Sequence, residues 1–296
     1  MIGYFYLAIV LVAGLVKGLF GKGISRDISS LNDGFTVNII RSAFCAIIGF
    51  AVAIIEVGIS GFALTFEAFI VCLASSIFMA VFCISWLYAY KSEASAFLNM
   101  FTMLASVATA IMGWAIYGDK IKGTSIAGFV LLFVAVYVMS LYNKNLKGKM
   151  SKKGLATLII GGLGVALSDF MQKVFIKQSL GQPCVFTFYT YFIMLVPQII
   201  VLLLLKKKNP IDKSGVLCDK RHVGVILIIS IALYVNVIMK TIAVGYIPST
   251  QMYPTLQGAN LVASSVCASI FFKEKMSKKS VVGVTIALIA VVLMNI

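Results

Sequence analysis

Polar side chains recur along one face of an otherwise apolar segment, residues 249–272. From Tyr253 they step forward by four, three and four residues, the spacing at which side chains share one face of an α-helix. A second apolar segment, 94–117, carries a similar stripe. Amide and hydroxyl groups in such rows suit hydrogen bonding to a polar solute, but they also hold helices together inside membranes, and both interpretations stay open. The stripes consist of Tyr253, Gln257, Asn260 and Ser264, and of Ser95, Asn99, Thr102, Ser106 and Thr109.

Charged side chains also stand inside apolar segments, where a charge is costly and therefore a candidate for function. Asp169 is the acidic residue placed well inside such a segment, and Lys173 follows four residues later on the same helical face, so a local ion pair is available. Either this pair only lowers the cost of insertion, or Asp169 exchanges Lys173 for a solute or a proton. The basic residues either reach to the membrane surface or face a cavity, where they favour a solute with a carboxylate or phosphate. They are Lys17, Arg41, Lys173 and Lys240.

Pro254 interrupts the backbone hydrogen bonding of segment 249–272, and we expect it to kink the helix. A freed carbonyl group beside a cavity can contact a solute, and a static kink is the alternative. The candidates for coupling or gating are therefore Asp169, Lys173 and Pro254. The candidates for solute binding are Asn99, Thr102, Tyr253, Gln257, Asn260 and Lys240.

The sequence contains none of the catalytic motifs that we searched for. The sequence has no HExxH motif and no paired carboxylates deep in apolar segments, and the six cysteines show no metal or redox spacing. The single histidine, His222, stands beside Arg221 at a segment edge and lacks partners for a metal site. We therefore expect no catalytic residue, no metal and no cofactor.

The segments that carry these residues are long enough to cross a bilayer. Apolar residue types make up 61% of the 296 residues and charged types only 12%, whereas soluble domains carry about 25% charge. A membrane core of about 30 Å requires roughly 20 apolar residues per helix. Connecting segments are too short for a separate soluble domain. The ten expected spans are 4–20, 36–56, 67–90, 94–117, 123–142, 154–178, 184–205, 223–244, 249–272 and 280–296.

Basic residues concentrate in the connections that follow the odd-numbered spans. These connections hold 18 of the 25 lysines and arginines, and the opposite side holds Lys120, Lys122 and Lys177. The positive-inside rule then places the basic connections in the cytoplasm and both termini outside a plasma membrane. The net charge of +15 thus reports topology, and we expect no nucleic-acid partner.

An internal repeat links the two halves of the sequence. Residues 94–140 align with 249–295 at a constant shift of 155, so that Asp119-Lys120 falls on Glu274-Lys275 and Gly128 falls on Gly283. With five spans per half, the halves must enter the membrane in opposite directions, as in many secondary transporters. The expected fold is all-α, with five-helix repeats at 1–143 and 154–296 joined by a basic loop at 144–153.

Each half also ends one helix on an acidic-basic pair, follows it with a short turn, and opens the next helix with a glycine. The pattern is Tyr117-Gly118-Asp119-Lys120 with Gly128, and Phe272-Lys273-Glu274-Lys275 with Gly283. It resembles the drug/metabolite transporter superfamily, in particular its EamA-type members with ten helices. The resemblance implies that spans 67–90, 94–117, 223–244 and 249–272 help to line a central cavity.

Four features of the sequence can be compared with those of family members. Pro254 matches a proline that the family often has, but Asn99 stands at the equivalent position of the first half, and Asp119 replaces the usual glutamate. Family members mostly keep both termini in the cytoplasm, whereas the charge distribution here places them outside.

The sequence therefore predicts a secondary transporter that works by alternating access and moves a small metabolite or drug-like solute, anionic or zwitterionic in character. The lipid bilayer is its other partner, and the sequence is compatible with either a monomer or a homodimer. A non-transporting scaffold or receptor is the first alternative, and an intramembrane enzyme is the second. A scaffold does not require polar stripes at symmetric positions, and an enzyme requires a reactive constellation.

Overall fold

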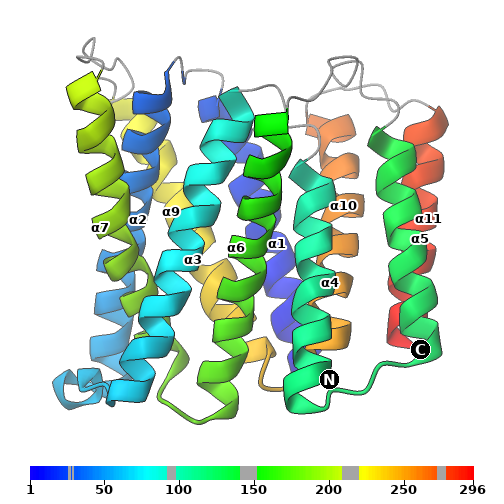
Figure 1. Ribbon diagram of the computed structural model, residues 1–296, viewed down its shortest axis with the longest axis horizontal. Helices are drawn as coiled ribbons and strands as arrows, with labels where there is room; N and C mark the ends of the chain where they lie inside the picture. Colours follow the sequence, from blue (N-terminus) through cyan, green and yellow to red (C-terminus); the bar gives the residue numbers. More distant parts are fainter. Residues whose placement is uncertain (26–27, 29, 92–97, 141–151, 209–219, 272–277) are drawn as a thin grey trace.

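The computed structural model describes residues 1–296 except 26–27, 29, 92–97, 141–151, 209–219 and 272–277. The regular structure of the described residues is helical, and the long helices lie side by side in one bundle (Figure 1). They are α1 (Ile2–Ser25), α2 (Leu31–Val57), α3 (Phe66–Lys91), α4 (Leu98–Tyr117), α5 (Gly123–Ser140), α6 (Lys152–Lys177), α7 (Pro183–Lys208), α9 (Lys220–Ala243), α10 (Ser249–Phe271) and α11 (Lys278–Asn295), with a short 3-10 helix η1 (Ile59–Phe62).

The long helices correspond to the expected spans, and α2 shows why their ends differ. It begins at Leu31, five residues before the expected start, because Ser30 and Asp33 form a capping box. The Ser30 hydroxyl accepts a hydrogen bond from the Asp33 N–H at 3.1 Å, and the Asp33 carboxylate accepts one from the Ser30 N–H at 3.2 Å. This polar first turn is invisible to a search for apolar residues.

Six helices within the described part of the chain are long and apolar enough to cross a membrane: α1, α2, α3, α6, α7 and α9. Shorter apolar stretches lie in α4, α5 and α11. Many large apolar side chains on these helices are exposed, including Phe50, Leu204 and Val292. Soluble proteins rarely expose so much apolar surface, because its contact with water is unfavourable. The chain is therefore a multi-pass membrane protein.

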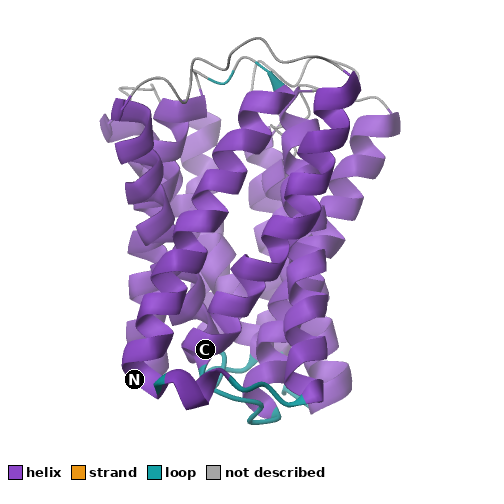
Figure 2. Ribbon diagram, turned by 90° about the vertical axis from the view of Figure 1, so that its left-hand side faces the viewer, coloured by secondary structure: helices purple, strands orange, loops and turns teal. Residues whose placement is uncertain are grey.

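Helices of the first half pack mainly against helices of the second half. The contacting pairs are α1 with α9, α3 with α6, α2 with α7, α4 with α10, and α5 with α11. Exchanging α1–α5 with α6–α11, in order, leaves this set of pairs unchanged. The two halves are therefore interleaved in one body. The view turned by 90° shows the long helices running along the bundle (Figure 2).

Two glycines allow particularly close approach between paired helices. A Cβ atom at Gly164 of α6 would lie 2.8 Å from the Phe78 carbonyl oxygen of α3, and one at Gly128 of α5 would lie 2.5 Å from the Met294 side chain of α11. Any larger residue at Gly164 would push α6 away from the backbone of α3. These contacts agree with the packing role that small residues have in membrane helices.

Both chain ends lie at the same face of the bundle (Figure 1). The connections 118–122, 178–182 and 244–248 lie there as well. We call this side the terminal face, and the opposite side, where α5 ends and α6 begins, the basic face. The described basic residues Lys152 and Arg221 are exposed near the basic-face ends of their helices.

Candidate functional site

A cavity of about 440 Å³ opens between α1, α3, α6, α9 and α10. On α10 its lining begins at Leu256, two turns into the helix, and continues to Cys267 near the basic-face end. On α1 the lining runs from Gly14 to Leu19. The volume suits a small organic molecule. Its polar lining residues are Lys17, Asp169, Asn236, Lys240, Gln257, Asn260 and Ser264.

The α10 wall of the cavity carries most of the predicted polar stripe. Gln257, Asn260 and Ser264 line the cavity from consecutive turns of the helix. Gly14 of α1 faces this wall, and a Cβ atom there would lie 3.3 Å from Asn260 Oδ1 and 3.4 Å from Asn236 Nδ2. The missing side chain thus leaves space beside two amide groups.

Tyr253 and Pro254, one turn earlier on α10, lie outside the cavity lining. Tyr253 is 2% exposed, and its hydroxyl donates a hydrogen bond to the Asp169 carbonyl oxygen at 2.7 Å. It therefore ties α10 to α6 immediately beside the Asp169 side chain. Pro254 is buried next to it inside the helix.

The expected pair between Asp169 and Lys173 is not the one that forms. Asp169 Oδ1 instead lies 2.5 Å from Lys240 Nζ of α9, and Lys173 pairs with the Asp119 carboxylate after α4. The local prediction is wrong because each side chain has an oppositely charged partner on another element. Asp169 and Lys240 face the cavity, whereas Lys173 is completely buried.

Lys173 and Asp119 belong to a closed cluster at the terminal face. The Asp119 carboxylate accepts a hydrogen bond from the Ser249 N–H at the start of α10 at 2.8 Å, so it also caps that helix. The Thr250 hydroxyl donates to the Lys120 carbonyl oxygen at 3.0 Å. Lys173 Nζ lies 5.3 Å from the centre of the Tyr117 ring. These contacts join the first half of the chain to the second; we call them the terminal-face latch.

The polar stripe predicted on α4 is not seen to line the cavity in its described part. The side chains of Asn99 and Thr102 lie outside the described residues, as does Ser95. Thr109 is buried, and its hydroxyl oxygen lies 3.0 Å from the Ala105 carbonyl oxygen and 3.2 Å from the Ala166 carbonyl oxygen of α6. Helix packing therefore accounts for this described end of the stripe.

Sequence reasoning missed Asn236 as a cavity residue. Its Nδ2 donates a hydrogen bond to the Val10 carbonyl oxygen at 2.7 Å, and it lines the cavity one turn from Lys240. The interval of four residues between Asn236 and Lys240, within an apolar segment, is the signal that would have revealed it. Lys17 was expected either to reach the membrane surface or to face a cavity, and the structure places it in the cavity wall.

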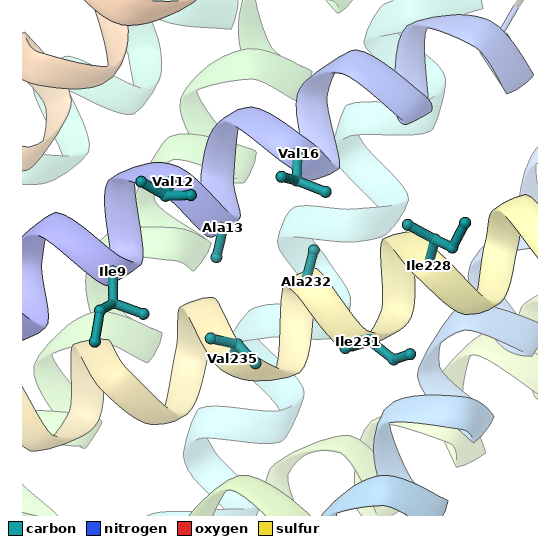
Figure 3. Close-up of a pocket in the computed structure, with 8 residues that line it drawn as sticks. All are labelled: Ile9, Val12, Ala13, Val16, Ile228, Ile231, Ala232 and Val235. Atoms are coloured by element: carbon teal, nitrogen blue, oxygen red, sulfur yellow. The ribbon is translucent and has the colours of Figure 1, made fainter.

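A second hollow, of about 300 Å³, lies between α1 and α9 and has different chemistry (Figure 3). The side chains in Figure 3 are all aliphatic, so they offer no hydrogen bond to a polar solute. They are Ile9, Val12, Ala13, Val16, Ile228, Ile231, Ala232 and Val235. The polar cavity is therefore the candidate site.

Comparison with known protein families decides what kind of protein carries this cavity. The sequence model of the EamA-like transporter family matches residues 1–141 and again residues 152–296. The chain belongs to the EamA-like transporter family. The EamA resemblance inferred from the acidic-basic pairs is thus confirmed, and the protein has the two-repeat architecture of this transporter family.

Other comparisons add information on the fold of this EamA protein. A solved structure described only as a protein crystal structure superimposes with a TM-score of 0.73 at 10% sequence identity, covering 97% of this chain and 95% of the other. At that identity the similarity concerns the fold alone. No curated protein matches the sequence significantly.

Proposed function

We propose that this EamA protein is a secondary transporter that moves a small organic metabolite or drug-like solute across the plasma membrane by alternating access. The observation that carries the proposal is the pairing of a polar cavity in the bundle with a latch that joins the two halves on one side of it. A solute held by Gln257, Asn260 and Lys240 would lie on the basic-face side of that latch. Releasing the latch and closing the other end would expose the same site to the opposite side.

The ten long helices, in this proposal, cross the membrane as two inverted five-helix repeats. In Figure 1, α1 starts at the terminal face, whereas its counterpart α6 starts at the basic face, which supports the inversion. The exchangeable helix pairs give further support. Such symmetry provides two equivalent closed arrangements, one for each side of the membrane.

The basic face is proposed to be cytoplasmic, with both termini outside. Cys218 lies outside the described residues, in the basic connection before α9. We expect a membrane-impermeant thiol reagent to label Cys218 only after the membrane is permeabilised. A Cys218→Ser variant identifies the signal, because it removes this thiol and leaves the others, including Cys267 in the cavity lining, in place. Labelling of Cys218 in sealed cells would contradict this orientation and place the basic face outside.

The solute-binding role of α10 is tested by removing its amides. We expect Gln257→Leu and Asn260→Leu each to weaken apparent affinity by about tenfold, because a lost hydrogen bond to a charged or polar solute costs roughly 1–3 kcal/mol. The solute is found by comparing metabolites inside and outside cells that express or lack the protein. Its uptake is then measured for each variant.

Thr285→Val is the matched control, since Thr285 is exposed on α11, and no described side chain of α11 lines the cavity. All variants must reach the membrane in equal amounts. Unchanged affinity in both Leu variants would assign Gln257 and Asn260 to helix packing. An identical metabolite distribution with and without the protein would favour the scaffold alternative.

A further inference from the structure

The charges in the cavity do not balance. Lys17 and Lys240 both line it, and Asp169 is the one carboxylate among the described residues of the lining. Asp169 lies 2.5 Å from Lys240, so this pair is neutral as a unit. Lys17 forms no ion pair with any carboxylate in the described part of the chain. Among the described residues, one positive charge in the cavity wall is therefore left without a counter-ion.

A second cation reinforces this charge. Arg41 of α2 interacts electrostatically with Lys17, and Lys240 does so as well. The Arg41 guanidinium donates a hydrogen bond to Asn38 Oδ1. Its buried Nε atom has no hydrogen-bond partner among the described residues. Neighbouring cations inside a membrane protein are unfavourable unless an anion joins them.

The remaining lining specifies what accompanies that anion. Around Lys17 the cavity wall is formed largely by apolar side chains, among them Leu15, Leu19, Met79, Phe82 and Leu261. A free inorganic ion would leave this surface facing water. A molecule with an apolar body and one compact anionic group would fill both environments.

We propose that Lys17, supported by the positive charge of Arg41, binds the oxyanion group of the transported solute, and that this solute is a small amphipathic carboxylate or phosphate monoester. The assignment rests on the proposed transport function for its physiological meaning. Binding itself does not depend on transport. Lysine and arginine both recognise either oxyanion, so the chemistry common to the two is the charged oxygen group.

The test compares three fluorescent probes of nearly the same shape: 2-naphthoate, 2-naphthyl phosphate and neutral 2-naphthamide. Binding of each to the purified full-length protein in nanodiscs is measured by titration. We expect at least one anion to bind about tenfold more tightly than the amide, as one charge-assisted hydrogen bond predicts. Comparing the two anions separates carboxylate from phosphate recognition.

Variants assign the preference to Lys17. In Lys17→Gln the anion preference should disappear, while Lys17→Arg should keep it because the positive charge remains. Lys177→Gln is the matched control, since Lys177 is an exposed lysine at the end of α6, outside the cavity. If Lys17→Gln fails to fold, the proposal is still tested by the other two measurements. The wild-type protein and Lys17→Arg should then both prefer the anions to the amide.

Three results would overturn the proposal: the amide binding as tightly as both anions, an anion preference that survives in folded Lys17→Gln, or no binding of any probe. The proposed transport function is tested by a separate result. An anion preference without any solute movement would leave the site intact and reject transport, whereas movement of a solute without anion preference would do the reverse.

Discussion

Asp169→Asn is expected to slow transport at least about tenfold while the protein still reaches the membrane. The change keeps the shape of the side chain but leaves the Lys240 ammonium without its partner at 2.5 Å. Breaking a buried ion pair by removing one member typically costs about 3–5 kcal/mol, because the other charge stays buried. The cavity would then hold two uncompensated lysines, Lys17 and Lys240. Efflux of the transported solute from proteoliposomes measures the effect.

The double variant Asp169→Asn/Lys240→Gln distinguishes two roles of Asp169. If the carboxylate serves only to neutralise Lys240, removing both charges should restore most of the maximal rate, measured at saturating solute so that the lost Lys240 contact with the solute does not limit it. If Asp169 exchanges Lys240 for the solute or a proton in each cycle, the double variant stays slow and its rate loses its dependence on pH. A single Asp169→Asn variant with the wild-type rate and pH dependence would show that Asp169 is structural.

Asp119→Asn is expected to destabilise the protein by about 3 kcal/mol and to open the terminal face. Lys173 is 0% exposed, so loss of the Asp119 charge leaves a fully buried ammonium. The Asp119 carboxylate also caps α10 by accepting a hydrogen bond from the Ser249 N–H. In Asp119→Asn the amide oxygen can still accept this bond, but it no longer forms an ion pair with Lys173. Thermal unfolding in detergent measures the stability.

The double variant Asp119→Asn/Lys173→Met should recover stability, because it removes both buried charges, and still lack the ionic part of the latch. Opening is measured with a Gln257→Cys reporter, whose labelling from the terminal face should rise severalfold in the double variant. Lys122→Gln is the control: Lys122 lies at the same face but donates instead to the Ile296 carbonyl oxygen. Unchanged labelling in the double variant would show that the ion pair does not hold this face closed.

Helix positions and one cavity wall were accessible from the sequence because they depend on local periodicity. Apolar runs of about 20 residues predict membrane-spanning helices, and the spacing from Gln257 to Asn260 to Ser264 predicts a shared face. That face lines the cavity. The acidic-basic pair at Asp119-Lys120 also identified the family correctly, although it did not reveal what Asp119 contacts.

Contacts between helices were less accessible, because the spacing on one helix does not specify which neighbour its face meets. Asp169 and Lys173 share a helical face, yet they pair with Lys240 and Asp119, which stand 71 and 54 residues away in the chain. For the same reason Tyr253 was expected to contact solute with Gln257, whereas its hydroxyl binds the backbone of α6. The side chains of Asn99 and Thr102 lie outside the described residues, so their solute contact stays a prediction.

Solute exchange by the purified protein tests the transport claim most directly. Proteoliposomes are loaded with a metabolite extract, and the contents are followed by mass spectrometry against protein-free liposomes. We predict that one or a few small amphipathic anions leave the proteoliposomes chemically unchanged, and that Asn260→Leu slows their loss. Equal retention of every metabolite in both kinds of vesicle, or chemical conversion of a solute instead of its movement, would contradict the account.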